Sequence, residues 1–260
     1  DGVDDNVELA DQTDPNDGNN YNFLNSGLVA YYPFNGNAND ESGNGHDGTV
    51  NGATLAPDRN GDTNSAYNFD GTGYIDCPDG VYFDGDFTVS GWVNLREHSR
   101  WSRLIDFANN GLGANASQVG ADHVTFTLST DDTGQPRGDV AGNNFVRSGV
   151  SLPLNQWAQV TWTFGQDTAT LYVDGQQVAE EAWNSPPAAV VRTDNWIGRS
   201  NWENTPTNDE RTNGALDDIR IYNRALSENE VTDLYEAESP ITLETGLVAY
   251  YPFNGNADDE

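Results

Sequence analysis

The sequence contains no lysine and no methionine, and its only cysteine is Cys77. All 11 basic side chains are arginine, against 42 acidic ones, so the formal net charge is −31. Such a negative protein repels phosphate backbones and anionic lipid surfaces, which excludes nucleic acids and membrane surfaces as partners. One cysteine cannot form an intrachain disulfide, and no apolar run approaches the roughly 20 residues that a membrane span needs.

Aliphatic residues are also scarce, because Val, Ile and Leu together with Phe make up only about a fifth of the chain. This composition lies near the border of disorder. The aromatic residues argue for a folded protein, since the 7 Trp, 11 Tyr and 10 Phe can each bury on the order of 150–250 Å². The missing methionine indicates a mature fragment or one module of a larger protein, so the lack of a signal peptide does not bear on secretion.

An internal repeat is the clearest feature of the sequence. Residues 27–41 read GLVAYYPFNGNANDE, and residues 246–260 repeat them 219 positions later with 14 of 15 residues identical. A period of this length corresponds to a whole domain, not to a solenoid unit. The sequence therefore predicts an array of similar domains, with the first strand of a second repeat at residues 246–260.

Between the two copies, short runs of alternating apolar residues predict an antiparallel β-sandwich. Asp174-Gly175 has the preferred two-residue hairpin sequence, and Ser227 with Glu230 forms a capping box that opens one short helix through Leu234-Tyr235. The predicted domain spans residues 26–236, after an acidic extension (1–25) and before a linker (237–245) and the repeated segment. The predicted strands are 87–94, 103–108, 123–129, 157–164, 169–173, 195–199 and 215–222.

The chain resembles the bacterial laminin-G-like, concanavalin-A-like jelly-roll domains from Gly27 to Tyr235. The resemblance is carried in order by the opening GLVAYYPFNGNANDESGNGHDG and by YNFDG with YI, FTVSGWV, LYVDG and LDDIRIYNRAL. It implies an all-β, antiparallel jelly-roll sandwich with one short C-terminal helix. It does not fix the function, because members of this family include sugar-binding modules, adhesin modules and structural spacers.

Residues 1–17 resemble the second half of a thrombospondin type-3-like calcium repeat. In such a loop Asp1, Asp5 and Glu8 occupy positions 5, 9 and 12, and Gly2 occupies the turn position. Carboxylate oxygens around a glycine turn are suited to Ca²⁺. Another interpretation remains, because any acidic tail contains such spacings by chance.

The jelly-roll resemblance implies a second calcium site at the edge of the sandwich. The matching residues are Asp40, Asp70 with the Gly71 carbonyl, and the pair Asp217 and Asp218. Because neighbouring strand residues face opposite ways, only one of the pair should face an ion, and we choose Asp217. Eleven arginines are too few to neutralise the clustered carboxylates, which favours calcium. The alternative is that these Asp side chains only accept backbone N–H bonds in turns.

Sugar recognition needs exposed aromatic rings beside polar side chains. The alternating patterns around Trp92, Trp157, Trp162 and Trp196 predict core positions, whereas Trp101, Trp183 and Trp202 lie in polar, loop-like sequence. Trp101 and Trp202 are the candidate carbohydrate-binding residues. Each ring could instead cover an end of the sandwich.

The sequence gives little support for catalysis. Laminarinase-type relatives of this fold carry Glu-x-Asp-x-x-Glu on one strand, and no Glu-x-Asp occurs here. There is no Gly-x-Ser-x-Gly elbow, and the three histidines lack metal-ligand spacing. We therefore expect no enzyme. The Arg137-Gly-Asp139 motif is assigned to turn chemistry in a 131–139 loop.

Two functions follow from these patterns. The first is a non-enzymatic, extracellular or cell-surface module that binds calcium and acts in adhesion or glycan binding. The second is a structural spacer or a filament-forming subunit, in which residues 246–260 exchange into the sheet of a neighbouring copy because near-identical strands compete for one place. A glycan-processing enzyme is the least favoured alternative.

Overall fold

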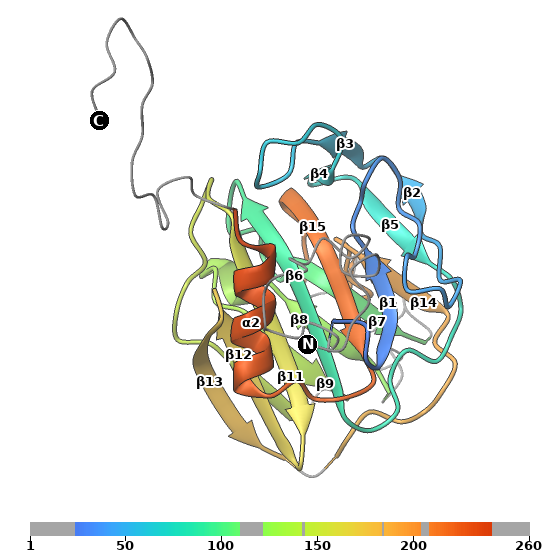
Figure 1. The fold of residues 1–260 in the computed structure, drawn as a ribbon, viewed down its shortest axis with the longest axis vertical. Coiled ribbons are helices and arrows are strands. Elements are labelled where there is room, and N and C mark those ends of the chain that lie inside the picture. The colour runs from blue at the N-terminus through green and yellow to red at the C-terminus, as the bar shows by residue number, and fades with distance from the viewer. Residues whose placement is uncertain (1–23, 110–121, 142–143, 184, 204–207, 241–260) are drawn as a thin grey trace, which may run out of the picture.

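The computed structural model describes residues 24–109, 122–141, 144–183, 185–203 and 208–240, and the statements below concern this part of the chain. Two antiparallel sheets stack face to face, and one helix lies on the outside of one of them (Figure 1). This is the all-β jelly-roll sandwich that the sequence predicts. No helix in these ranges is long and apolar enough to cross a membrane.

Sheet A contains the first and the last strand of the domain. Its strands are β1 (Leu28–Tyr32), β3 (Thr54–Ala56), β4 (Ala66–Asp70), β6 (Phe87–Leu95), β11 (Ala158–Gly165), β12 (Thr168–Val173), β13 (Gln176–Ala182) and β15 (Asn213–Tyr222). The order is β13-β12-β11-β6-β15-β4-β3. Along β15, one edge pairs with β6, and the other is shared between β4 at residues 213–216 and β1 at residues 219–222.

Sheet B supplies the opposite layer. Its strands are β2 (Thr49–Asn51), β5 (Tyr74–Cys77), β7 (Arg103–Ala108), β8 (Val124–Thr127), β9 (Arg137–Val140), β10 (Asn144–Arg147) and β14 (Asp194–Ile197), in the order β10-β9-β8-β7-β14-β5-β2. A 3-10 turn, η2 (Thr130–Asp132), follows β8. Each of the seven strands predicted from the sequence is confirmed, with both ends within two residues of the observed ones.

The core fills the space between the inner faces of the two sheets. Trp162 of β11 is fully buried and packs edge-on against Phe87 of β6, with Phe126 of sheet B on its other side. Aromatic rings in such contacts add stabilisation beyond the apolar area that they bury. Aromatic rings therefore share the core with the Val, Ile and Leu side chains of both sheets.

The Arg-Gly-Asp motif lies in strand β9 and not in a loop as the sequence interpretation had it. Gly138 faces the core, where a Cβ atom would come within 2.3 Å of Cε2 of Trp162. Arg137 and Asp139 point to the outer face and form an ion pair with each other. The glycine is therefore required by the tryptophan, and the two charged residues belong to a sheet surface.

Helix α2 (Glu228–Glu238) begins with the predicted capping box, in which the Ser227 hydroxyl accepts from Glu230 N and the Glu230 carboxylate accepts from Ser227 N. Figure 1 shows α2 lying across the outer face of sheet A. Its Val231 and Leu234 are fully buried against Tyr222 of β15. The helix extends past the predicted end at Tyr235, because the side chain of its last residue is buried in the domain.

Candidate functional site

The outer face of sheet B carries a row of polar and aromatic side chains. Strand register aligns residues of β5, β14, β7, β8, β9 and β10 across the sheet: Asp76, Trp196, Asp106, Thr125, Asp139 and Phe145. Their neighbours Ile75, Ile197 and Ile105 face the core, because side chains alternate along a strand. We call this surface, with residues 198–203 and 208–212 that lie on it, the sheet B face.

Asp106 forms the buried centre of the sheet B face. Its carboxylate accepts from Nε of Arg103 at 3.0 Å, from the backbone N of Asn201 at 3.1 Å and from Nδ2 of Asn201 at 2.8 Å. Burial raises the pKa of Asp106 above its ordinary value, although Arg103 and the bonds from Asn201 oppose that shift. These bonds tie Asn201 and the residues next to it to β7.

Trp202 is held over this centre by the same segment. Ser200 Oγ accepts from Trp202 N at 3.0 Å and donates to Asp209 at 2.7 Å, and Asp209 also accepts from Arg103 Nη2 at 2.8 Å. The Arg103 guanidinium lies 5.8 Å from the centre of the Trp202 ring. His123 meets the ring edge-on at 4.9 Å. The indole is half-buried and fixed on the sheet by polar neighbours.

Trp101 reaches the same face from the other side. His123 Nε2 lies 3.2 Å from Asp139 Oδ1, and Asp139 also accepts from Arg137. The Arg137 guanidinium lies 5.6 Å from the centre of the Trp101 ring, which is also half-buried. A continuous series of contacts thus connects Trp202 to Trp101. The two tryptophans chosen from sequence as sugar ligands share one surface.

The electrostatics of Asp139 follow from these contacts. Burial by itself would raise the pKa of Asp139, but the hydrogen bond from His123 and the charge of Arg137 outweigh it, and the pKa is lowered. Asp139 therefore stays ionised and holds His123 and Arg137 in place. A carboxylate engaged in this way positions its neighbours and is poorly placed to act as a general acid.

A second group of rings and arginines continues the face toward β5. Tyr74 meets Trp196 edge-on at 5.4 Å, and the Arg199 guanidinium lies 4.4 Å from the Tyr74 ring. Glu203 accepts from Arg199 and from Arg211, and these arginines lower its pKa against the opposing effect of burial. The alternating pattern had predicted that Trp196 belongs to the core. Its side chain instead lies on the outer side of the sheet, opposite to the side chains of Asn195 and Ile197. In the sequence, only the apolar Ile197 indicates this, because neighbouring strand residues face opposite ways.

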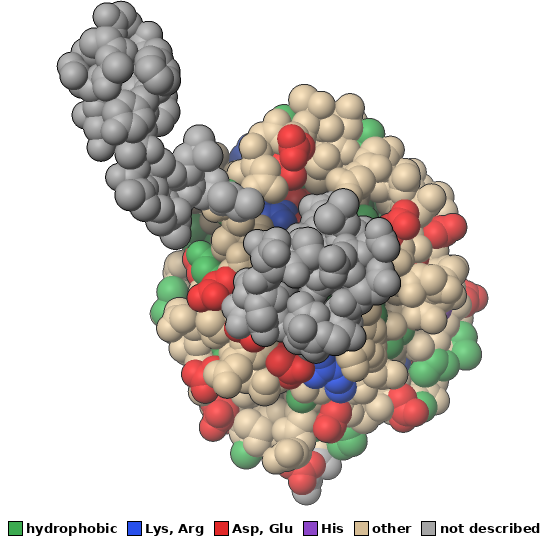
Figure 2. Space-filling view, in the orientation of Figure 1, with side chains coloured by type: hydrophobic (Ala, Val, Ile, Leu, Met, Phe, Trp, Pro, Cys, Tyr) green, Lys and Arg blue, Asp and Glu red, His purple; other side chains and the backbone are tan. Residues whose placement is uncertain are grey.

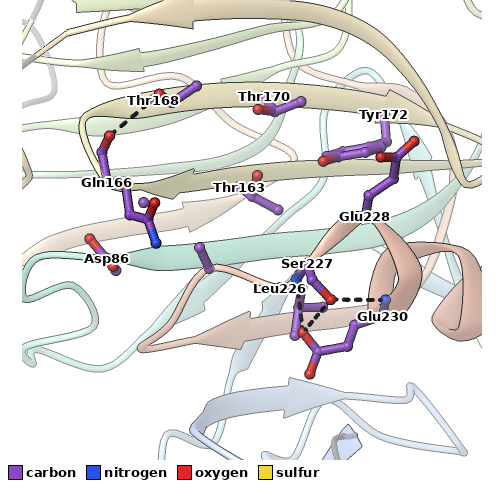
Figure 3. Close-up of a pocket in the computed structure, with 12 residues that line it drawn as sticks. Asp86, Thr163, Gln166, Thr168, Thr170, Tyr172, Leu226, Ser227, Glu228 and Glu230 are labelled. Carbon is purple, nitrogen blue, oxygen red and sulfur yellow. Dashed lines mark hydrogen bonds between the residues drawn. The ribbon is translucent and has the colours of Figure 1, made fainter.

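The hollows on the described surface include one beside each sheet. One, of about 410 Å³, adjoins the sheet B face and is lined by Glu203, Asp209 and Arg211 together with residues of the 97–99 segment. The other, of about 360 Å³, lies on sheet A between β12 and the start of α2. Figure 3 shows the hydroxyls of Thr163, Thr168 and Thr170 lining the second hollow, which has one aromatic ring, Tyr172, and no tryptophan. Neither Trp101 nor Trp202 therefore lines the second hollow.

The proposed calcium ligands do not come together in the described part of the chain. Asp40 accepts backbone N–H bonds from Tyr31, Ser42 and His46, each at 2.9 Å. Asp70 accepts three bonds from residues 72 and 73, one of them from the Thr72 hydroxyl at 2.6 Å. Among the described residues, no group of three or more His, Cys, Asp or Glu side chains is arranged to hold a metal. Asp1, Asp5 and Glu8 lie outside these residues.

Asp217 and Asp218 do not face opposite ways. Nη1 of Arg59 lies 2.7 Å from a carboxylate oxygen of each. The strand register shifts between Asp217 and Arg220, and Asp218 has φ of 45°, so a bulge turns both side chains to the same side. The prediction that only one of the two carboxylates faces a cation is therefore wrong at this bulge. Both face the Arg59 guanidinium, which lies where a calcium ion was expected.

Arginine also provides more of the buried counter-charge than the composition suggested. Arg220 pairs with Glu238 at 2.8 Å, and Arg103 pairs with both Asp106 and Asp209. On the face that carries α2, Figure 2 shows acidic side chains spread among uncharged ones and few basic ones. Many arginines are thus used inside the fold, and the scarcity of arginine no longer argues for calcium at the sandwich edge.

Three other tryptophans differ from expectation. Trp157, expected in the core, is only half-buried just before β11. Trp183, expected in a loop, is buried in the core and stacks on Phe164 at 5.4 Å. Trp92, expected in the core, is buried on the outer side of sheet A, with Arg59 4.7 Å from its ring and Tyr235 of α2 stacked at 5.6 Å. The alternation of residues within one strand predicts that a side chain is buried. It does not predict whether the other sheet or a helix such as α2 buries it.

Comparison with known proteins identifies the fold family. The family model described as the Concanavalin A-like lectin/glucanases superfamily matches residues 69–232, which is more than half of the chain. A comparison with curated proteins found no match.

Several solved structures have the same fold. Domain 4 of an extracellular GH43 arabinanase from Geobacillus stearothermophilus, in complex with arabinotriose, superposes with a TM-score of 0.64 at 20% identity, over 80% of this chain and 98% of that one. The binding domain of Paraclostridial Mosquitocidal Protein 1 gives 0.57 at 19%, over 82% and 52%. A Trypanosoma rangeli sialidase in complex with the inhibitor DANA gives 0.55 at 20%, over 80% and 32%. The chain thus spans about half of the toxin domain and about a third of the sialidase.

Proposed function

Because the chain belongs to the Concanavalin A-like lectin/glucanases superfamily, we propose that it is a non-enzymatic glycan-binding module whose sugar site is the sheet B face. The observation that carries the proposal is that Trp101 and Trp202 share this face and are joined through His123, Asp139 and Arg137. The C–H groups of a sugar can stack on the exposed faces of these indoles, and the half-buried rings lose little side-chain entropy on binding. Planar guanidinium, imidazole and carboxylate groups beside them suit sugar hydroxyls.

Two of the structural relatives support this choice by the ligands in their titles. The arabinanase domain was solved with arabinotriose, and a botulinum neurotoxin DC binding domain, with a TM-score of 0.58 at 13% identity, was solved with SialylT. The chain matches nearly the whole arabinanase domain, which is a part of a larger enzyme. By analogy, this chain would bind a glycan, while catalysis or adhesion would be carried out by other domains.

The proposal contains no catalytic step. A glycosidase of the usual type needs one carboxylic acid and one carboxylate on either side of the scissile bond. On the described part of the sheet B face, Asp106, Asp139 and Glu203 are each bonded to arginine. Because the fold also occurs in a sialidase, a glycan-processing enzyme remains the less favoured alternative.

We place the module outside the cell or on its surface, as one unit of a tandem array that acts in adhesion. The acidic surface and the extracellular arabinanase relative support this location. Calcium binding stays part of the proposal through Asp1, Asp5 and Glu8. The Asp40, Asp70 and Asp217 carboxylates are already engaged by donors of the protein, so they do not fit a shared calcium site.

The test is binding of the 260-residue chain to an immobilised glycan array that includes arabinotriose. Trp202→Ala should weaken binding about 10-fold or more, which corresponds to about 1.4 kcal/mol. Trp101→Ala should act in the same direction. The matched control is Trp157→Ala, because Trp157 is half-buried just before β11 and lies away from the sheet B face. Unchanged binding by Trp202→Ala, or an equal loss in Trp157→Ala, would contradict the proposed site.

A structural role is the second candidate function, as a spacer or a filament-forming subunit. The observation in its favour is the near-identity of residues 246–260 to the segment that contains β1, which among the described strands pairs with β15 alone. In a filament, the repeated segment of one copy would pair with β15 of the next. Light scattering tests this role, because deletion of residues 246–260 should abolish polymers. If the protein polymerises and binds no glycan on the array, this function is favoured over the first.

A further inference from the structure

Strand β1 occupies a well-defined slot at the edge of sheet A. Its Ala30 and Tyr32 are fully buried, as is Phe34 just after it. The register pairs Tyr31 with Arg220 and Tyr32 with Ile219. On the far side of β1, Asn44 Nδ2 donates to the backbone oxygens of residues 28 and 29, and Glu41 N donates to Tyr31 O. The slot is therefore formed by β15, the core and the 40–44 loop.

Tyr31 makes the most specific polar contacts in this slot. Its hydroxyl donates to Asp218 Oδ1 at 2.6 Å, and the Arg220 guanidinium lies 3.7 Å from the centre of its ring. At the entrance, Asn223 N donates to the carbonyl oxygen of Gly27, which has φ of 78° and therefore favours glycine. Any segment that replaces β1 must supply this glycine, the small Ala30 and an aromatic hydroxyl at position 31.

Residues 246–253 supply all of these groups. Gly246, Ala249 and Tyr250 correspond to Gly27, Ala30 and Tyr31, and every residue from 246 to 253 is identical to its counterpart in 27–34. The one difference between the two copies, Asn39 against Asp258, falls at an exposed position outside the slot. The contacts that hold β1 therefore do not distinguish the two segments.

The end of α2 lies beside the slot. The carboxylate of Glu238 accepts from Nε of Arg220, whose guanidinium covers Tyr31. From there, residues 239–245 can extend by about 23–25 Å, at 3.3–3.6 Å per residue. The whole length of β1 is about 17 Å. This linker is long enough to bring Leu247 to the position that Leu28 occupies.

We propose that residues 246–253 compete with residues 27–34 of the same chain for the β1 slot, so that the chain exchanges between two folded forms. Both segments are covalently attached to the slot, which gives each an effective concentration of the order of millimolar. A segment from a second copy at micromolar concentration is therefore the weaker competitor. This inference does not depend on glycan binding. In the form in which residues 246–253 occupy the slot, residues 27–34 are released from it.

A matched pair of substitutions tests the competition, because Trp in place of a fully buried Ala prevents that copy from entering the slot. Ala30→Trp blocks the first copy, Ala249→Trp blocks the second, and the double variant blocks both. Hydrogen exchange with mass spectrometry reads which segment is protected. The flanking sequences distinguish peptides 27–41 from peptides 246–260. Light scattering gives the oligomeric state of each variant.

The expected results are specific for each variant. Ala249→Trp protects residues 28–34, Ala30→Trp protects residues 247–253 and exposes 28–34, and both remain monomers with cooperative melts. The double variant loses the melt or melts far below either single variant. The inference is overturned if Ala30→Trp melts like the double variant, or if residues 28–34 stay protected in it. It is also overturned if Ala30→Trp folds only in polymers, which would assign the exchange to a second copy.

Discussion

Glu238 anchors the end of α2 to sheet A, and its truncation should be among the most damaging single changes outside the core. Its carboxylate accepts from Arg220 Nε at 2.8 Å, from Trp92 Nε1 at 2.8 Å and from Gln159 Nε2 at 3.0 Å. All three donors belong to buried side chains. Glu238→Ala leaves a buried guanidinium and two buried N–H groups without their acceptor.

The magnitude follows from the burial of these groups. Removing one partner of a buried ion pair costs about 3–5 kcal/mol, because the other charge stays desolvated. Burial raises the pKa of Glu238 and thus offsets part of its stabilising effect, while Arg220 opposes that shift. We therefore expect the lower half of the range, about 3–4 kcal/mol. Glu238→Gln keeps the volume and a neutral acceptor, so it should cost about 1–2 kcal/mol.

The assay is urea unfolding followed by circular dichroism, with the m-value as a check that the compactness of the unfolded chain is unchanged. Glu236→Ala is the matched control, because Glu236 lies in the same helix turn but is exposed and should change stability by less than about 0.5 kcal/mol. The reasoning is refuted if Glu238→Ala is no more destabilising than Glu236→Ala. A larger loss for Glu238→Gln than for Glu238→Ala would refute it as well.

Three further predictions concern the same fold. Burial, reinforced by Asp218 and opposed by Arg59, raises the pKa of Asp217 from 3.8 to about 9. Between these two values the folded state binds a proton that the unfolded state has lost, so the free energy of unfolding falls as the pH rises from about 4 to 9. Asp217→Asn should flatten this slope in melts recorded across that pH range. An unchanged slope would contradict the protonated state. Ser227→Ala should cost about 0.5–2 kcal/mol through loss of the capping box, with exposed Asn229→Ala near zero in the same melts. Addition of EDTA should lower the melting temperature by several degrees if calcium binds the folded protein, and identical melts would remove the calcium proposal.

The sequence predicted the sandwich because its signals are local. The alternation in residues 103–108 and 215–222 marks strands wherever they pair, and the Asp174-Gly175 turn has positive φ at both residues, as its sequence indicates. The capping box at Ser227 formed as expected. Each of these features depends on neighbours within a few residues, so no knowledge of the tertiary contacts was needed.

The parts that failed depend on contacts between distant residues. The bulge at Asp218 reverses a side chain, and only the position of Arg59, 159 residues earlier, shows what the two carboxylates face. Trp196 reads as a core residue because both faces of its strand are covered, one by the other sheet and one by Arg199 and Asn201. Trp101 and Trp202 were identified from their polar surroundings, but their common face follows from the strand order of sheet B.

The pairing of β1 with β15 has a consequence for the timing of synthesis. Residues 28–32 leave the ribosome about 190 residues before their partner, residues 219–222, is complete. At about 5–20 residues per second, the first strand waits about 10–40 s without its partner, exposed to other chains and to proteases. The repeated segment at 246–253 follows the completed β15 within a few seconds. The repeated segment is thus made when the slot has only just formed, so the order of synthesis lets either copy of the motif be the one that pairs with β15.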